Sequence, residues 1–223
     1  MIIVSLLNIK GNIMNSIKKF NTEEDLKKYI NNLVIRNVGS GTEGYAALTK
    51  ANDIIKYIEW QHRIPYDEEI ITTADYKLES FNFPNKLILC KSHVAGYRTR
   101  YFNDNLLDTN GEKYINLSKL LTARKRMIED IKVISKDKYR MNDIENNLLF
   151  DGERLCAIDT LDYRIVSNLT LSDNIELLDE AIRIKLCMID PRIAFWNIST
   201  EDVIKRMIKE KEIRKINIYK KAV

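Results

Sequence analysis

The sequence predicts a mixed α+β fold in two lobes, a sheet-forming first part and a mostly helical second part. Short β-branched and aromatic runs recur up to Phe102, whereas helical spacing of apolar residues dominates from Ser118 onward. Between them, the polar segment 103–111 has the composition of a connector or hinge. A length of 223 residues suits one domain or two small lobes around a cleft.

In the first part, Thr22 and the acidic residues after it predict a helix start, because threonine caps a helix and carboxylates suit its first turn. Strands are expected where β-branched and aromatic residues cluster, at 34–38, 45–48, 54–58, 86–90 and 94–102. Pro65 and Asp67 predict a further short helix over residues 65–81. This part therefore has about five strands of an antiparallel sheet.

In the second part, an apolar stripe with basic residues opposite predicts a long helix over residues 118–136. The Asp151-Gly152 pair predicts a turn between short strands at 148–150 and 155–158. Helical spacing returns over residues 171–188 and 200–211. No internal repeat interrupts this order.

Composition and charge describe an ordinary globular protein, with 45% hydrophobic and 30% charged residues and a formal net charge of +4. The basic excess is local, since residues 205–223 contain eight Lys or Arg and two Glu. A solvated helix explains this tail, and contact with RNA, an acidic partner or a membrane surface is the alternative. Tyr219 is its only aromatic residue, which argues against a base-stacking surface and against nucleic acid as a partner.

The cysteines and histidines lack the spacing of a metal site or of a disulfide framework. Cys90, Cys156 and Cys187 are odd in number and lie in apolar runs, which predicts buried free thiols in a reducing cytoplasm. His62 and His93 are too isolated for a zinc site. No apolar run reaches the roughly 18 residues that cross a bilayer, so we expect a cytoplasmic protein without membrane insertion.

A glycine-rich loop joins the first two strands of the sheet-forming part. Gly39, Gly41 and Gly44 form a GxGxxG pattern, and glycines let the backbone approach phosphate oxygens without side chains in the way. A flexible hairpin is the alternative explanation. Lys56 follows in an apolar strand, where it is either a snorkelling edge residue or a phosphate contact. The hairpin setting separates this loop from a strand-to-helix dinucleotide turn.

Two polar clusters follow much later in the chain. Asp143 and Asn147 lie in an Asp/Asn-rich loop directly before an apolar strand, and Asp159 ends the next strand. An Asp/Asn-rich turn before a hairpin explains the first cluster without any chemistry. A carboxylate at the end of a buried strand is well placed to hold a divalent cation.

The order of glycine loop, lysine, Asp-to-Asn loop and late aspartate resembles the protein-kinase-like fold over about residues 34–165. It is similar to minimal bacterial or phage kinase-like proteins, including atypical kinases. The resemblance implies a small lobe at 1–102, with an N-terminal extension, a five-stranded sheet and one helix. It implies a truncated helical large lobe at 103–223, with ATP and magnesium in the cleft.

The resemblance also implies a role for each matching residue. Gly39, Gly41, Gly44 and Lys56 would contact the nucleotide phosphates. Asp143 would orient the acceptor hydroxyl and accept its proton. Two further residues would ligate magnesium, namely Asn147 and Asp159. An acidic partner of Lys56 is expected on the following helix, at Glu68, Glu69 or Glu79.

Several departures from the kinase pattern leave two functions open. Met141 replaces the histidine of the catalytic loop, and Glu145 stands where kinases usually carry a lysine, adding like charge. The loop is one residue short, and the part after Asp159 is too short for a complete large lobe. We therefore expect either an ATP- and magnesium-dependent phosphotransferase with an unidentified acceptor, or a pseudokinase that regulates a protein partner.

Overall fold

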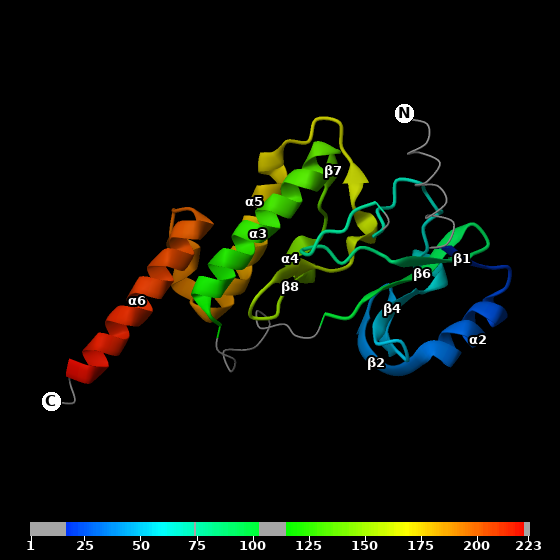
Figure 1. Ribbon diagram of the computed structural model, residues 1–223, viewed down its shortest axis with the longest axis horizontal. Helices are drawn as coiled ribbons and strands as arrows, with labels where there is room; N and C mark the ends of the chain where they lie inside the picture. Colours follow the sequence, from blue (N-terminus) through cyan, green and yellow to red (C-terminus); the bar gives the residue numbers. More distant parts are fainter. Residues whose placement is uncertain (1–16, 74, 103–114, 221–223) are drawn as a thin grey trace. The chain divides into compact units, whose positions relative to one another are not determined.

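The computed structural model describes residues 17–73, 75–102 and 115–220, with side chains up to residue 211 (Figure 1). The expected connector at 103–111 and most of the N-terminal extension lie outside the described residues. The chain divides into two compact units, which are described separately. The first contains the described residues up to Leu78, then Asn82–Phe102 and Asp159–Tyr163. The second contains Glu79–Phe81, the described residues from 115 to Ile158, and the described residues from Arg164 onward.

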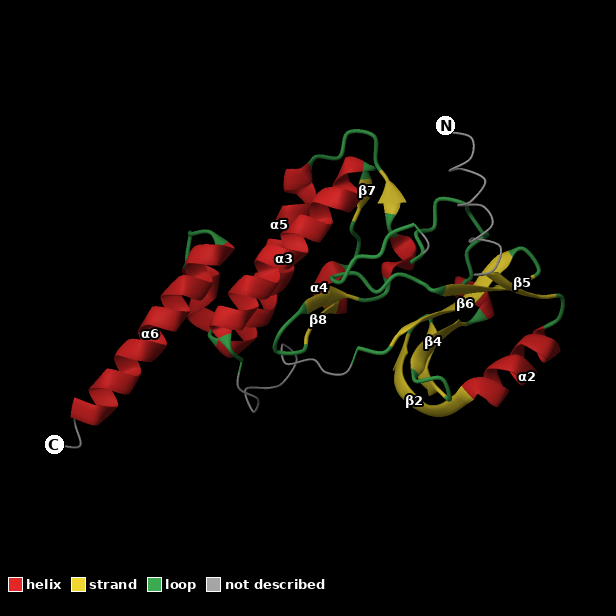
Figure 2. Cartoon of the chain, viewed as in Figure 1, coloured by secondary structure: helices red, strands yellow, loops and turns green. Residues whose placement is uncertain are grey.

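The first unit is built on a six-stranded sheet with the order β1-β5-β6-β4-β3-β2 (Figure 2). Its strands are β1 (Ile17–Phe20), β2 (Val34–Gly41), β3 (Gly44–Thr49), β4 (Asp53–Ile58), β5 (Lys86–Cys90) and β6 (His93–Arg100). The five predicted strands are confirmed. The sixth, β1, pairs in parallel with β5, whereas all other pairs are antiparallel. The mixed α+β class is therefore confirmed, with one strand more than expected.

One face of this sheet is covered by α2 (Glu23–Leu33). The Thr22 side chain accepts a hydrogen bond from the Asp25 backbone N–H at 3.2 Å, which confirms the predicted helix start. The buried Leu26 and Ile30 pack against apolar residues of the strands, namely Ala47, Ile55, Ile88, Cys90 and Ala95. Burial of these side chains fixes the helix to the sheet.

The opposite face carries a second apolar cluster and the candidate lysine. Ile58, Tyr97 and further strand residues (Leu87, Leu89, Val94) pack with Ile70 and Leu161. Side chains alternate along a strand, so Lys56 lies on the same face as Ile58. Residues of the segment Asp159–Tyr163 thus belong to the core of the first unit.

The predicted helix over residues 65–81 is wrong, since the described residues of this segment form turns and no helix. Ile70, Ile71 and Thr72 are all buried, and three consecutive residues spread over more of a helix surface than one apolar stripe covers. Asp67 and Asp75 accept hydrogen bonds from nearby backbone N–H groups at 3.0 and 2.7 Å. Such local bonds compete with helix formation, and Pro65 forms an isolated β-bridge instead of starting a helix.

The second unit is mostly helical, as predicted. Its helices are α3 (Leu117–Lys136), α4 (Ile144–Asn147), α5 (Leu171–Ile189) and α6 (Thr200–Lys220). Two small hairpins complete it: β7 (Tyr139–Arg140) with β10 (Arg164–Ile165), and β8 (Leu148–Phe150) with β9 (Leu155–Ala157). The predicted helix at 200–211 is longer than expected, and its C-terminal end extends beyond α3 and α5 (Figure 1).

Buried polar links hold the helices of the second unit together. Arg124 of α3 donates two hydrogen bonds to the Asp179 carboxylate of α5, at 2.6 and 2.7 Å. A bidentate arginine–carboxylate pair fixes orientation as well as distance. Cys90 and Cys156 are buried free thiols, as predicted, and Cys187 is half-buried. Within the described residues, no helix combines the length and apolar character that a bilayer crossing requires.

Candidate functional site

The glycine pattern forms a β-hairpin between β2 and β3. Gly41 pairs with Gly44 across the turn, and Gly39 pairs with Ala46. Gly44 has a φ of +153°, and a Cβ there would lie 2.0 Å from the Tyr57 carbonyl oxygen, so the sheet itself requires this glycine. A Cβ at Gly39 or Gly41 would meet nothing within 4 Å. These two glycines therefore have no packing reason to be glycine.

Lys56 lies in the middle of β4 and forms two ion pairs. Its Nζ is hydrogen-bonded to Oδ2 of Asp159, 103 positions later in the chain. A second contact, Nζ to Oε2 of Glu43 at 3.4 Å, reaches the turn between the glycines. The Lys56 side chain is 18% exposed, so it is largely withdrawn from water while its end meets two carboxylates.

The partner of Lys56 therefore differs from the expected one. The helix that was to carry Glu68, Glu69 or Glu79 does not exist in the described residues, which removes the predicted geometry. Asp159 occupies that role in the first unit, because its short segment returns to the sheet face on which Lys56 lies.

Asp159 is also held by Tyr97 of β6. The Tyr97 hydroxyl donates a hydrogen bond to Oδ1 of Asp159 at 2.6 Å. Burial raises the pKa of Tyr97 well above its ordinary value, and the Asp159 charge raises it further. The phenol is therefore neutral at physiological pH and acts as a donor.

The backbone around Asp159 is turned by an unusual conformation. Asp159 has φ 57° and ψ 54°, in the left-handed region that aspartate tolerates better than most residues. After it, Leu161 enters the apolar cluster of the sheet, and the Tyr163 ring meets Phe83 edge-on at 6.3 Å. These contacts anchor the segment that follows the turn.

The second predicted cluster is compact and lies within the second unit. Asp143 also has a left-handed backbone, φ 47° and ψ 34°, directly before α4. Its carboxylate accepts hydrogen bonds from the Asn146 amide at 2.6 Å and from the Asn147 amide at 3.0 Å. The Asn147 amide also donates to the Asp143 carbonyl oxygen at 3.0 Å. Both amides orient the carboxylate, which stays exposed to solvent.

The loop before Asp143 is fixed by a buried asparagine. Asn174 of α5 accepts a hydrogen bond from the Met141 backbone N–H at 2.9 Å. Its amide donates to the Ser135 hydroxyl and to the Tyr139 carbonyl at 2.8 and 2.9 Å. Met141 itself is buried and apolar, so packing replaces the polar histidine of the kinase pattern.

The structure thus brings Lys56 together with Asp159 in the first unit, and Asp143 together with Asn147 in the second. Their catalytic and metal-binding roles remain predictions. Sequence reasoning missed three supporting residues: Tyr97, Asn146 and Asn174. Tyr97 and Asn174 are buried polar residues inside ordinary strand and helix patterns, which carry no signal of their partners.

The donor set is of the kind that magnesium prefers. Asp159 offers a carboxylate and Asn147 an amide oxygen, both hard ligands. Among the described residues, no group of three His, Cys, Asp or Glu is arranged to hold a metal ion. Magnesium usually keeps several waters and needs only one or two protein carboxylates beside substrate phosphates, so the chemistry of each residue by itself suits a phosphate-bound ion. Asp159 belongs to the first unit and Asn147 to the second, and their joint role stays a prediction.

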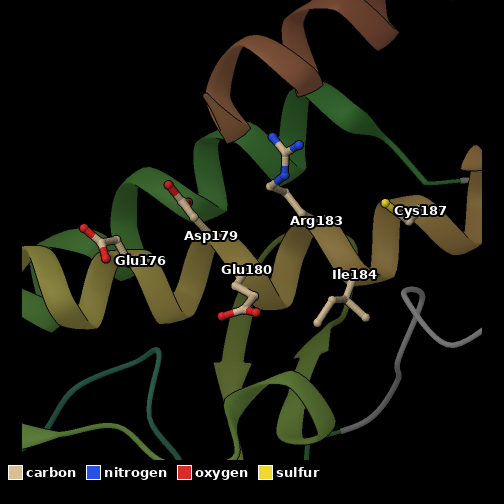
Figure 3. A pocket seen from close by; sticks show the side chains of 6 residues that line it. All are labelled: Glu176, Asp179, Glu180, Arg183, Ile184 and Cys187. Atoms are coloured by element: carbon tan, nitrogen blue, oxygen red, sulfur yellow. The ribbon is translucent and has the colours of Figure 1, made fainter. Parts of the chain in front are cut away.

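A surface hollow of about 530 Å³ lies along α5 and is lined by none of the predicted site residues (Figure 3). Of its lining residues, Asp179 is committed to Arg124. Arg183 donates to the carbonyl oxygens of Trp196 and Ile198, both at 2.8 Å. These side chains stabilise the helical unit, so the hollow is not the candidate site.

Comparison with known proteins finds similarity among solved structures. No protein-family model and no curated protein matches the sequence. Among solved structures, the chain is similar to the kinase PK-1 of Cydia pomonella granulovirus, with 13% identity and a TM-score of 0.47. The match covers 65% of this chain and 59% of that kinase. The chain thus matches less than two thirds of the kinase.

Proposed function

We propose that the protein is an ATP- and magnesium-dependent phosphotransferase of protein-kinase-like fold. The observation that carries this proposal is the ion pair between Lys56 and Asp159. The kinase resemblance implies phosphate binding for Lys56 and magnesium binding for Asp159, and the two residues lie 103 positions apart. Their contact in the same unit is what a shared nucleotide site requires.

The chain's own residues supply positioning and charge in this proposal. Lys56 binds the inner phosphates, with the backbone at Gly39 and Gly41 following the phosphate chain. Asp143 orients an acceptor hydroxyl, whose oxygen forms a bond to the terminal phosphorus while the bond to the leaving ADP breaks. The hydroxyl proton passes to the Asp143 carboxylate. Asn147 and Asp159 would hold magnesium, which would supply positive charge against the phosphates.

The charge around Lys56 supports the proposed dependence on a divalent cation. One ammonium meets two carboxylates, Asp159 and Glu43, so this group carries a net negative charge before any ligand arrives. A nucleoside triphosphate adds several more negative charges, which repel these carboxylates. Binding should therefore depend strongly on magnesium.

A pseudokinase is the second candidate, and two observations favour it. Met141 is buried and apolar, so no imidazole supports the loop before Asp143. Glu145 is exposed two positions after Asp143, where it repels a phosphoryl group. Under this alternative the chain binds a nucleotide without transferring phosphate and regulates a protein partner.

Thermal unfolding with ATP separates these candidates. At an ATP concentration of about 100 Kd, binding to the folded state adds about 2.7 kcal/mol of stability. We expect an upward shift in Tm with ATP and magnesium, a much smaller shift with ATP and a chelator, and no shift in Lys56→Met. Formation of ADP with the magnesium complex supports the enzyme, and binding without turnover supports the pseudokinase. No shift under any condition refutes nucleotide binding.

A further inference from the structure

Tyr97 and Lys56 hold the same carboxylate from two adjacent strands. They are directly opposite each other in the pairing of β4 with β6. Tyr97 donates to Oδ1 of Asp159 at 2.6 Å, and Lys56 pairs with Oδ2. The Lys56 Nζ also lies 5.9 Å from the centre of the Tyr97 ring. Each oxygen of Asp159 therefore has its own partner.

The backbone makes this arrangement possible at one glycine. Gly96 precedes Tyr97, and a Cβ there would lie 2.3 Å from the Lys56 carbonyl oxygen. The two strands approach closely at this point only because Gly96 has no side chain. Lys56 and Tyr97 therefore lie opposite each other on closely spaced strands.

The two holds on Asp159 differ in chemistry. Lys56 is a cation on a long flexible stem, and it also contacts Glu43, so it can exchange one anion for another. Tyr97 is 3% exposed, and its ring is fixed among Ile58, Leu87, Leu89, Val94 and Leu161. The packed ring of Tyr97 cannot move toward a bound phosphate. Its hydroxyl already has a charged acceptor, Asp159.

We propose that Tyr97 is the positioning residue that keeps Asp159 in place when Lys56 moves to the nucleotide phosphate. Lys56 then leaves Oδ2, which becomes the oxygen open to a divalent cation, while Oδ1 remains bonded to Tyr97. This inference rests on the proposed nucleotide function and assigns a role that the kinase resemblance does not supply. Tyr97 touches neither nucleotide nor acceptor in this scheme, and it acts only through Asp159.

The test compares Tyr97→Phe with Tyr57→Phe, which is a matched control. Both changes remove one phenol oxygen from neighbouring strands, but the Tyr57 hydroxyl accepts a hydrogen bond from Arg63 at 3.1 Å and does not contact Asp159. ATP affinity is measured by calorimetry, once with magnesium and once with a chelator. We expect Tyr97→Phe to weaken ATP binding about tenfold with magnesium and less than about twofold with the chelator. Tyr57→Phe should change neither value by more than about twofold.

A double-mutant cycle with Asp159→Asn checks the coupling without any ligand. Thermal unfolding of the single and double variants should show that Tyr97→Phe costs less stability when Asp159 is already Asn. Magnesium-dependent ATP binding that is unchanged in Tyr97→Phe overturns this inference alone. Equal weakening with magnesium and with the chelator also overturns it, because Tyr97 would then be only structural. Wild-type binding that ignores magnesium overturns the proposed function and this inference together.

Discussion

The Asn174 side chain accepts a hydrogen bond from the backbone N–H of Met141, and this contact helps to tie α5 to the loop that carries Asp143. The asparagine is fully buried, and its amide nitrogen serves two more acceptors. A buried amide with all its partners satisfied defines a loop conformation more strictly than apolar packing does.

Replacement of Asn174 by Ala should destabilise the protein by about 2–4 kcal/mol, because the Met141 N–H and its neighbours lose buried partners. Urea unfolding followed by circular dichroism measures this. Asn32→Ala, an exposed position in α2, is the control and should stay within about 0.5 kcal/mol of wild type. A loss below 1 kcal/mol for Asn174→Ala would show that the network is dispensable.

Two glycines of the hairpin should respond oppositely to Ala substitution. Gly44→Ala places a Cβ 2.0 Å from a backbone oxygen and should cost about 2–4 kcal/mol of stability. Gly41→Ala meets open space and should leave Tm nearly unchanged, while it weakens ATP binding because the backbone can no longer approach phosphate as closely. Unchanged ATP affinity in Gly41→Ala would assign the turn to folding alone.

Removal of the Glu43 charge should strengthen nucleotide binding. Glu43 contacts Lys56 from an exposed turn, so it competes with phosphate for the same ammonium. Because such a pair is partly solvated, Glu43→Gln should raise ATP affinity by only about two- to fivefold. Glu59→Gln, an exposed carboxylate just after β4, is the control. A weaker affinity in Glu43→Gln would mean that Glu43 orients Lys56 instead of competing with the ligand.

Asp143→Asn should abolish phosphate transfer and leave ATP binding intact. The amide cannot accept the hydroxyl proton, and general-base catalysis typically contributes about 10²- to 10⁴-fold in rate. A radiometric or coupled ADP assay measures the loss, with the exposed Glu68→Gln as a matched carboxyl-to-amide control. Transfer that continues at the wild-type rate would remove Asp143 from the mechanism.

The pair between Glu23 and Arg63 predicts a pH-dependent part of the stability. The hydrogen bond from Arg63 holds the pKa of Glu23 below its ordinary value of 4.5, although partial burial opposes this. A folded-state pKa below the unfolded one adds stability that is present above about pH 4.5 and is lost as pH falls through the folded value. Glu23→Gln should therefore cost about 1 kcal/mol at pH 7, since Glu23 is partly solvent-screened, and less at pH 3. Equal Tm differences at both pH values would contradict the linkage.

The sequence predicted those parts of the fold whose signals are local. Thr22 caps α2 as expected, and the Asp151-Gly152 pair turns between β8 and β9. The prediction of a helix at 65–81 was wrong. Pro65 and the Asp residues resemble a helix start, but the burial of Ile70 and Ile71 depends on packing against the rest of the unit, which local signals do not show. Parallel pairing of β1 is a non-local event that short-range patterns do not reveal.

The candidate site was predictable in its residues but not in its contacts. Lys56 and Asp159 were identified from their order along the chain, yet the acidic partner of Lys56 was expected elsewhere. Tyr97 had no signal because a tyrosine in a strand usually means packing. Its role depends on a segment that returns from 62 positions later in the sequence.

The five residues Asp159–Tyr163 belong to the first unit, although the chain on either side of them belongs to the second. A truncated protein that stops at residue 102 would consequently be missing a piece of its own interior, including Leu161, and would present Lys56 without the carboxylate it meets in the intact chain. Inhibitor screens or binding studies on isolated halves would then use a protein with an incomplete core. A shortened protein therefore has to retain residues Asp159–Tyr163, for instance by joining them to the first unit through a short linker.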